Sequence, residues 1–475
     1  MKKSLLFFAL LLSSVNLFAQ QLAQYNTETL FDSFENPSQR SFIRDSSRMF
    51  ASNFLFPTAG TDLVITGNAQ VSLKSRAFDA RYNNSALQIG QGKFNHITVN
   101  ANIYLLMFKI YTSQDGDQEL GFSLQSRGEG NALFTDETVA LFNGSGSFET
   151  GAYNNPFKGN AYYQTYHQLG VTYREKITPR FALGLKLNFL MGAQYQKLKI
   201  YNSYIEFNDQ DNAILALNAQ RYTSHVEGTS GARDFKPSLR NPGLSFTLGG
   251  SYKNDEGVVF QGNLKDVGFI RWNSKASIYN IDGATMLTDL STRQREDSTS
   301  AQLSRLLRTG NLETGHFFTP TDGRAELSAS KAYWLNYDQT WKMSPSIIVN
   351  KQLFYSGFTA AVVNHIQYKK CIVTVLSSYN DLNLLSFGGQ FMFKTPNAEF
   401  FLGSERVFET GRTILAAYGR QSQITHSGAF TGGNLFFGVS FKFGNYIESP
   451  MNASRMPSGE PGFFGRLYHR LFKSN

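Results

Sequence analysis

The sequence predicts an all-β fold, a transmembrane antiparallel up-and-down barrel of about 14 strands. Three observations predict it. Residues 181–191, "FALGLKLNFLM", alternate large apolar residues with small or polar ones over 11 positions, and similar alternation recurs along the chain. Short and long connections take turns between such stretches. The N-terminus has the form of a secretory signal, and no apolar run of 18 residues follows it, so any membrane crossing must use strands.

Residues 1–19 predict a signal peptide that is cleaved near Ala19. Lys2 and Lys3 form a charged start, residues 5–12 are apolar, and Ala19 is a small residue at a plausible cleavage point. The apolar run is shorter than the roughly 20 residues of a spanning helix. A buried N-terminal helix is the alternative. The predicted location is therefore the bacterial outer membrane, with membrane lipid and the barrel-assembly machinery as expected partners.

The 11-residue alternation favours lipid over a protein core as the medium on the apolar face. Strands of soluble sandwiches are typically about 5–6 residues long, whereas a tilted strand needs about 9–11 residues to cross a bilayer. The opposite face of residues 181–191 is mostly Ala, Gly, Lys and Asn, which suits a crowded or water-filled lumen. The same alternation predicts one apolar face on an earlier strand, made of Ile97, Val99, Ala101, Ile103, Leu105 and Met107.

Polar residues at the predicted lumen-facing positions are the candidate site residues, and they are Arg174, Lys186, Asn188 and Lys442. A charge on the lipid side near the bilayer midplane would cost about 2–4 kcal/mol, so the alternation places these side chains inside. Two interpretations stay open. These residues could form a selectivity or ligand-gating element, or they could be lumen charges that are solvated or paired with a hatch.

Connection lengths indicate how the chain is divided. "KITPR" and "KNDEG" are short, whereas long polar loops are predicted at about 196–240 and 273–325, the second with a short helix in "STSAQLSRLLRTG". Short turns at one end and long loops at the other are typical of outer-membrane barrels, whose short turns are periplasmic. We therefore expect the barrel to span residues 49–444 and a periplasmic basic tail to span residues 445–475.

The end of the chain carries two further features. The predicted last strand contains "GVSFKF", which is similar to the C-terminal signal read by the barrel-assembly machinery, a glycine followed by alternating aromatics; Phe436 departs from that pattern. The tail ends in the basic and aromatic stretch "FFGRLYHRLFK". We expect this stretch to dock on the inner leaflet or on a partner, or else to be a frayed end without a function.

Composition and motifs exclude several classes of function. The formal net charge is +9, falling to +7 without Lys2 and Lys3, and the basic residues are dispersed, which favours anionic lipid headgroups over nucleic acid. Cys371 is the only cysteine, so no internal disulfide can form. None of the seven histidines is paired at metal-ligand spacing, and no Gly-x-Ser-x-Gly elbow occurs. We therefore predict no catalytic, metal-binding or cofactor-binding residues and no enzyme activity.

Several short stretches resemble known outer-membrane barrels. "FENPSQ" resembles the Asn-Pro-Ala element in the N-terminal hatch of FadL-type transporters, with Ser38 in place of Ala. "NPGLSFTLGGSYKND", "LKDVGFIRW" and "AEFFLGSERVF" resemble an uncharacterised family of Bacteroidota outer-membrane barrels, similar to FadL-type and PorV/PorP-like proteins, some of which serve type IX secretion. The resemblance implies that residues 20–48 form a hatch-like segment containing Asn36 and Pro37. An ordinary periplasmic turn is the alternative there.

Two functions are compatible with these observations. The first is a FadL-like, porin-like channel that passes a hydrophobic or amphipathic small molecule through a hatch-gated lumen. The second is a non-transporting accessory barrel that binds secretion or surface-assembly proteins. A continuous path or an apolar pocket at the hatch would favour the channel, whereas a filled lumen beside a large apolar loop patch would favour the accessory role.

Overall fold

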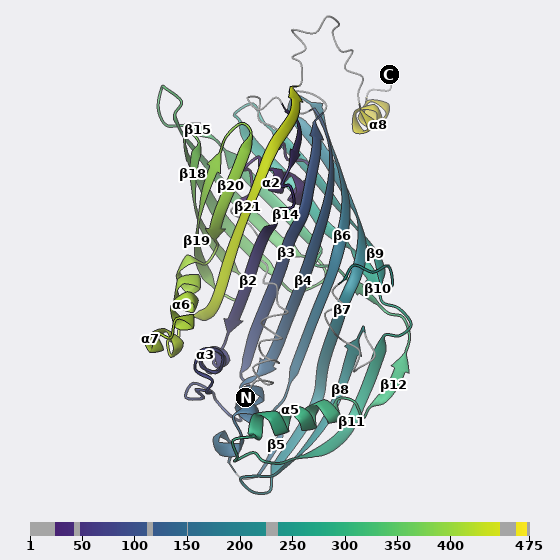
Figure 1. Cartoon of the computed structure of the whole chain (residues 1–475), viewed down its shortest axis with the longest axis vertical. Helices are drawn as coiled ribbons and strands as arrows, with labels where there is room; N and C mark the ends of the chain where they lie inside the picture. Colours follow the sequence, from purple (N-terminus) through teal and green to yellow (C-terminus); the bar gives the residue numbers. More distant parts are fainter. Residues whose placement is uncertain are drawn as a thin grey trace, which may run out of the picture.

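The protein is a closed antiparallel β-barrel, as the sequence predicts. The computed structural model describes residues 24–41, 48–111, 117–149, 151–224, 236–446 and 462–472, and the predicted signal peptide lies outside them. Fourteen strands form the wall in this part of the chain, the first of them broken into β1 and β2 (Figure 1). In chain order the wall consists of β1 (Arg48–Ser52) with β2 (Thr58–Thr66), β3 (Phe94–Tyr111), β4 (Gln118–Thr135), β6 (Gly159–Thr178), β7 (Phe181–Phe207), β9 (Pro242–Lys253), β10 (Val258–Arg271), β14 (Arg324–Lys331), β16 (Trp341–Gln352), β17 (Phe358–Tyr368), β18 (Cys371–Asn380), β19 (Leu385–Lys394), β20 (Ala398–Ser404) and β21 (Phe430–Tyr446).

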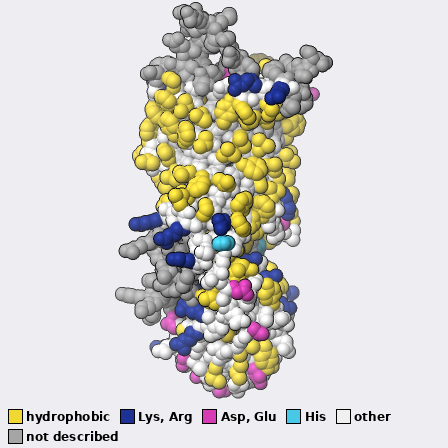
Figure 2. Space-filling model, turned by 90° about the vertical axis from the view of Figure 1, so that its right-hand side faces the viewer, with side chains coloured by type: hydrophobic (Ala, Val, Ile, Leu, Met, Phe, Trp, Pro, Cys, Tyr) yellow, Lys and Arg dark blue, Asp and Glu magenta, His cyan; other side chains and the backbone are white. Residues whose placement is uncertain are grey.

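The wall separates an apolar exterior from a polar interior. Along residues 181–191 the alternation has the predicted sense: the side chain of Leu187 is 56 % exposed, whereas those of Lys186 and Asn188 are 2 % exposed. On the face that Figure 2 shows, hydrophobic side chains form a broad belt across the barrel, with charged side chains mainly beyond its two edges. This distribution matches a bilayer outside and polar groups inside.

The two regions predicted as long loops contain strands. Strand β7 continues to Phe207 and pairs on one side with β5 (Gly151–Asn154) and on the other with β8 (Ala213–Thr223), which is followed in the sheet by β11 (Ser277–Leu287) and β12 (Asn311–Thr314). Helices α4 (Asp136–Phe142) and α5 (Arg295–Leu306) contribute to the apolar core on one face of this extracellular sheet. Register shifts in β7, between residues 192 and 194 and between 200 and 202, interrupt the alternation that marks strands in the sequence. The helix predicted in the second loop is confirmed as α5.

Shorter elements lie at the barrel ends. They are α2 (Leu30–Glu35), α3 (Ala69–Asp79), η3 (Ser145–Ser147), β13 (Phe318–Pro320), β15 (Tyr333–Trp334), α6 (Val407–Ala417), α7 (Gln421–Ile424) and α8 (Phe463–Phe472). Within the described ranges, no helix has the length and apolarity needed to cross a membrane. The short turn after β6, the short turn after β9 and α8 share one end, which we take as periplasmic (Figure 1).

A bulge in β3 corrects the predicted outer face of that strand. The register against β4 shifts between Tyr104 and Leu106, so one extra residue enters the strand. Beyond the bulge the alternation changes sense, so Met107 is buried inside the barrel rather than facing lipid. It belongs to an apolar cluster with Tyr104, Phe401 and Phe436, which we call the interior cluster. Lys109 and Tyr111 are turned inward by the same shift.

Residues 24–41 lie inside the periplasmic half of the barrel, and we call them the hatch. Helix α2 begins after Thr29, whose hydroxyl accepts a hydrogen bond from the Asp32 amide. The apolar side chains of Leu30, Phe31 and Phe34 are at most 3 % exposed and pack against wall residues of the interior cluster. The hatch and inward-facing apolar side chains of the wall therefore share one cluster inside the barrel. Figure 1 shows α2 enclosed by the strands.

Glycines in the wall admit the hatch backbone. A Cβ at Gly184 would lie 2.1 Å from the carbonyl oxygen of Pro37, and a Cβ at Gly249 would lie 2.4 Å from Oδ1 of Asn36. Any side chain at Gly184 would displace main-chain atoms of the hatch, which cannot rotate away. The small residue that the alternation places on the inner face at position 184 therefore leaves room for the main chain of the hatch.

Substitution of Gly184 by Ala is expected to loosen the hatch while leaving the wall intact. Overpacking of this kind costs about 1–3 kcal/mol, and backbone amides of residues 30–39 should exchange with solvent faster. Hydrogen exchange followed by mass spectrometry on the detergent-solubilised protein measures this. Gly250→Ala on the paired strand is the matched control, because its Cβ would meet only a side-chain carbon of Leu183, 3.6 Å away. Equal protection in both variants would contradict the prediction.

Candidate functional site

The carboxylate of Glu35, at the end of α2, is the centre of the contacts between hatch and wall. It accepts hydrogen bonds from the hydroxyl of Tyr104, at 2.7 Å, and from Nδ2 of Asn102, at 3.1 Å. It also forms an ion pair with Lys265 of β10. The main-chain oxygen of Glu35 accepts a bond from Asn263, 3.1 Å away. Strands β3 and β10, on different sides of the lumen, thus hold the same hatch residue.

Lys186 and Asn188 belong to the same network. The ammonium of Lys186 donates to the hydroxyl of Tyr104 at 2.9 Å and lies 5.1 Å from the centre of its ring. Asn188 donates to Oδ1 of Asp266 at 3.3 Å, and the other oxygen of Asp266 pairs with Arg127. Lys186 therefore supports the hydroxyl that bonds Glu35, whereas Asn188 supports the neighbouring pair of Asp266 and Arg127.

Arg174 holds the other end of the hatch. Its Nε donates to the main-chain oxygen of Ser38 at 2.9 Å, and its Nη1 lies 3.6 Å from Glu119. Glu119 also pairs with Lys109 at 2.8 Å and accepts a bond from the hydroxyl of Ser41 at 2.9 Å. Lys109 and Glu119 are fully buried, so each charge depends on its partners rather than on water.

Lys442 lies on β21, the last strand, which closes the barrel by pairing with β1 and β2. It lies 3.4 Å from Glu399 of β20, whose other oxygen accepts the main-chain amide of Leu30 at 3.1 Å. From the adjacent strand, Lys394 donates to the main-chain oxygens of Thr27 and Glu28, at 2.6 and 2.9 Å. Cationic side chains therefore face hatch carbonyls and wall carboxylates around most of the lumen.

The two predicted hatch residues lie in the turn that follows α2. Asn36 accepts bonds from the amide and hydroxyl of Ser38 and donates to Gln261 of β10 at 3.3 Å. Pro37 passes over Gly184. All six predicted residues thus lie in or around the hatch contacts. The sequence analysis did not single out Glu35, Lys109, Glu119, Lys265 and Glu399. The signal that could have found them is the occurrence of acidic and basic residues at inward-facing positions of the predicted strands.

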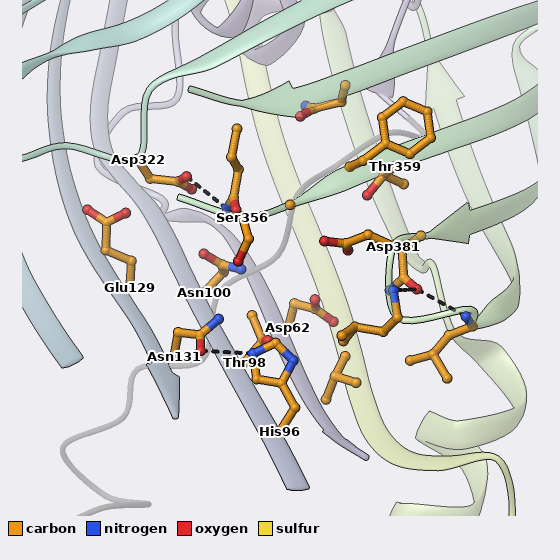
Figure 3. A pocket seen from close by; sticks show the side chains of 18 of the residues that line it. Asp62, His96, Thr98, Asn100, Glu129, Asn131, Asp322, Ser356, Thr359 and Asp381 are labelled. Atoms are coloured by element: carbon orange, nitrogen blue, oxygen red, sulfur yellow. Dashed lines mark hydrogen bonds between the residues drawn. The ribbon is translucent and has the colours of Figure 1, made fainter. Parts of the chain in front are cut away.

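A cavity of about 110 Å³ lies in the extracellular half of the lumen, beyond the hatch, and we call it the vestibule. Figure 3 shows that its side chains converge from β2, β3, β4 and from the turns that follow β16 and β18. His96 bonds to Asn131 at 2.8 Å, and Asp322 accepts a bond from Gln352 at 2.9 Å. A smaller cavity of about 20 Å³ reaches from Glu129 and Asp322 to Glu35 of the hatch.

The vestibule is polar and carries more carboxylates than cations. Its acidic lining residues are Asp62, Glu129, Asp322, Asp381 and Glu405, and its arginines are Arg324 and Arg406. The two arginines pair with Asp322 and Asp62, respectively. The carboxylates outnumber the arginines, so the vestibule favours a cationic or neutral polar group over an anion.

The wall next to the vestibule is incompletely paired. Strand β2 pairs with β21 over residues 59–66. Its pairing with β3 consists of one pair, Thr58 with Tyr104, although the structure describes all of residues 48–111. Asp62 of β2 and His96 and Thr98 of β3 line the vestibule on the two sides of this break. The hydrogen-bonded wall is thus interrupted where the vestibule lies.

A strained and apolar segment separates β1 from β2. Phe54 and Leu55 have φ angles of 47° and 66°, which bulky side chains rarely adopt. Phe54, Leu55 and Phe56 are 49–68 % exposed on the outside of the wall. The ring of Phe54 packs 4.7 Å from that of Phe443 on β21. This kink segment places exposed apolar side chains directly before Thr58, the residue at which the break between β2 and β3 begins.

A family model matches most of the described barrel. The model, described as a family of unknown function (DUF5723), matches residues 64–405. The chain belongs to this family. No curated protein matches the sequence of this chain.

Several solved structures are similar to this DUF5723 protein. The toluene transporter TodX of Pseudomonas putida has 9 % identity and a TM-score of 0.39, with 90 % of this chain and 94 % of that one covered. A deltaS2S3 mutant of TodX, named a monoaromatic hydrocarbon channel, has 9 % identity and a TM-score of 0.41, covering 86 % and 94 %. The translocator domain of the autotransporter NalP from Neisseria meningitidis has 7 % identity and a TM-score of 0.30, covering 83 % and 88 %.

Within the described residues of this DUF5723 protein, no three His, Cys, Asp or Glu side chains are placed to hold a metal ion. The carboxylates of the lumen are instead engaged by Lys, Arg and amide groups, as described above. What this arrangement offers chemically is charge and hydrogen bonding.

Removal of Glu119 is expected to destabilise the DUF5723 barrel strongly. Glu119→Ala leaves Lys109 and Arg174 buried without their carboxylate, and breaking a buried pair in this way costs about 3–5 kcal/mol. The measurement is the free energy of unfolding in denaturant, with the protein in detergent micelles. Asp255→Ala is the control, because it breaks an exposed pair with Arg180 in a periplasmic turn and should change stability little. A Glu119 variant as stable as the control would contradict the assignment.

Proposed function

We propose that this protein is an outer-membrane channel for a small amphipathic molecule, closed at its periplasmic end by the hatch. The observation that carries the proposal is the position of the vestibule beside the incompletely paired β2–β3 boundary. A polar cavity lies inside this boundary, and the exposed apolar side chains of the kink segment lie next to it. An amphipathic molecule has the two kinds of surface that such a boundary offers.

The break in the wall supports exchange between lumen and membrane. Strand separation normally requires loss of several ladder hydrogen bonds, but between β2 and β3 most of those bonds are already absent. The strained φ angles of Phe54 and Leu55 are consistent with a segment that holds the strands apart. A polar head in the vestibule and an apolar tail among Phe54, Leu55 and Phe56 would satisfy both media.

The hatch supports a closed state at the periplasmic end. The hatch residues from Glu35 to Ser41 occupy the lumen. Several strands of the wall hold them by ion pairs and hydrogen bonds. Passage to the periplasm therefore requires the hatch to shift. Arg174, Lys186, Asn188 and Lys442 would act in this proposal as the groups that release or retain it.

The accessory role is the second candidate, and two observations favour it. The lumen at the level of the hatch is filled by side chains, and the described cavity next to it is polar rather than apolar. Helix α6 exposes Phe408 and Ile414, and Tyr418 follows them at 84 % exposure. These residues could meet a secretion or surface-assembly protein, including one of a type IX system.

Transport is tested with cysteines on opposite faces of one strand. In a Cys371→Ser background, Thr98→Cys places a thiol in the vestibule, and Val99→Cys places one on the opposite face. Proteoliposomes take up a fluorescent alkyl-trimethylammonium dye, and a bulky thiol reagent is then added. We expect the reagent to slow uptake several-fold for Thr98→Cys and to leave Val99→Cys unchanged.

Other outcomes decide against the channel. Equal uptake in protein-free vesicles, or no effect of the reagent at residue 98, would contradict it. Rapid entry of a trisaccharide, measured by liposome swelling, would indicate a general pore instead. Copurification of a stoichiometric protein that is lost in Phe408→Ser and Ile414→Ser variants would favour the accessory role.

A further inference from the structure

The C-terminal helix α8 has the pattern of a membrane-surface helix. Its sequence, "FFGRLYHRLF", spaces apolar residues three and four apart and gathers the basic residues on the other side. It contains no acidic residue. Low overall hydrophobicity with a basic polar face and aromatic residues opposite is typical of helices that lie in the headgroup region of a bilayer.

Glu175 of β6 fixes the start of α8. Its two carboxylate oxygens accept the main-chain amides of Phe464 and Gly465, at 2.7 and 2.9 Å. The ring of Phe464 packs against that of Tyr173, with centres 5.6 Å apart. Gly462 approaches so closely that an added Cβ would lie 2.5 Å from the hydroxyl of Tyr173. The helix is therefore docked on the barrel at its first turn.

The docking site lies on the outer face of the wall. Leu169 and Val171, at the same parity of β6 as Tyr173 and Glu175, are 47 % and 46 % exposed to the lipid side. A carboxylate at this parity would be costly beside lipid, but the unpaired amides at the start of α8 bury Glu175 to 3 % exposure. Figure 1 shows α8 beside the barrel, at the height of the periplasmic strand ends.

The remainder of α8 leaves apolar and basic groups uncovered. Phe463 and Leu467 are 61 % and 46 % exposed, and Arg466 and Arg470 are also exposed. The basic side chains Lys176 and Arg180 lie at the adjacent end of β6 and in its turn. We propose that α8 is an interfacial helix that binds the anionic phospholipid surface of the periplasmic leaflet.

The position of α8 favours lipid over a protein partner. Phe464 packs on Tyr173, which follows the lipid-facing Leu169 and Val171 on the same face of β6, so a membrane that surrounds the barrel would reach the helix. Its arginines match the sign of an anionic leaflet, and interfacial helices gain from buried apolar side chains and from this attraction together. This inference is independent of what passes through the lumen.

The test places an environment-sensitive fluorophore at residue 467 of the full chain. Cys371→Ser removes the native thiol, Leu467→Cys provides the new one, and the labelled protein is reconstituted in two kinds of vesicle. One contains phosphatidylethanolamine with phosphatidylglycerol, and the other replaces phosphatidylglycerol by phosphatidylcholine. We expect blue-shifted emission and quenching by spin-labelled lipid, both stronger in the anionic vesicles.

Charge reversal separates lipid binding from protein packing. Arg466→Glu with Arg470→Glu should abolish the preference for anionic vesicles. Lys275→Glu with Arg293→Glu is the matched control, because it makes the same change of net charge at exposed residues near the other end of the barrel. Glu175→Gln weakens the contact between β6 and α8 and should reduce quenching by spin-labelled lipid. The heat-dependent shift in electrophoretic mobility checks that the barrel of this variant is still folded.

Three results would overturn the inference. Emission typical of water in both vesicles would show that α8 does not meet lipid. Blue-shifted emission in both vesicles without quenching by spin-labelled lipid would show that residue 467 packs on protein. Shielding that appears only when periplasmic extract is added would assign the helix to a protein partner.

Discussion

The ion pair between Glu35 and Lys265 is the interaction on which the interior arrangement depends. A closed wall removes bulk water from its inner face, so each charge there needs a partner within the barrel. The hatch supplies one carboxylate at Glu35, and Lys265, Tyr104 and Asn102 converge on it from two strands. Without the hatch, Lys265 would still have Glu326 at 4.0 Å, whereas Tyr104 would lose its acceptor. The hatch is thus part of the polar interior rather than an addition to it.

The hatch and the incomplete wall divide the lumen into unlike halves. In the periplasmic half the wall is fully paired around the apolar cluster of Phe31 and Phe34. In the extracellular half the cavity is polar and the wall is interrupted between β2 and β3. The kink at residues 53–57 marks the change, because β1 pairs with both neighbours, whereas β2 pairs with β21 along its length and with β3 at Thr58 alone within residues 48–111. The two halves of the lumen therefore differ both in the pairing of their wall and in the polarity of what they enclose.

The sequence predicts the barrel well because the physical signal is repeated on every regular strand. Alternation over 11 residues assigns Lys186 and Asn188 to the inside without any knowledge of their partners. It fails where a bulge adds a residue: Met107 and Lys109 change faces because of the irregularity near residue 105. Bulges in β7 conceal the extracellular sheet in the same way, so strands there read as polar loop.

The partners inside the lumen could not be predicted from alternation, since it gives a face and not a neighbour. Arg174 and Glu35 lie far apart in the sequence, and the hatch brings both into one interior. Of the two interpretations left open for the lumen residues, the bond from Arg174 to Ser38 agrees with pairing to a hatch, whereas Lys186, Asn188 and Lys442 are paired with residues of the wall. A role in selecting a solute stays a prediction, because no contact in the vestibule involves Arg174 or Lys442.

Strand alternation also explains how β6 binds both the N-terminal hatch and the C-terminal helix α8. Arg174 and Glu175 are consecutive residues of β6, so they point to opposite faces of the wall. Arg174 holds the carbonyl of Ser38 inside, and Glu175 holds the first turn of α8 outside. Each charged group is placed where a main-chain group of the opposite polarity can reach it. The alternation that sorts lipid from lumen therefore also anchors the hatch and the C-terminal helix at the same height of the barrel.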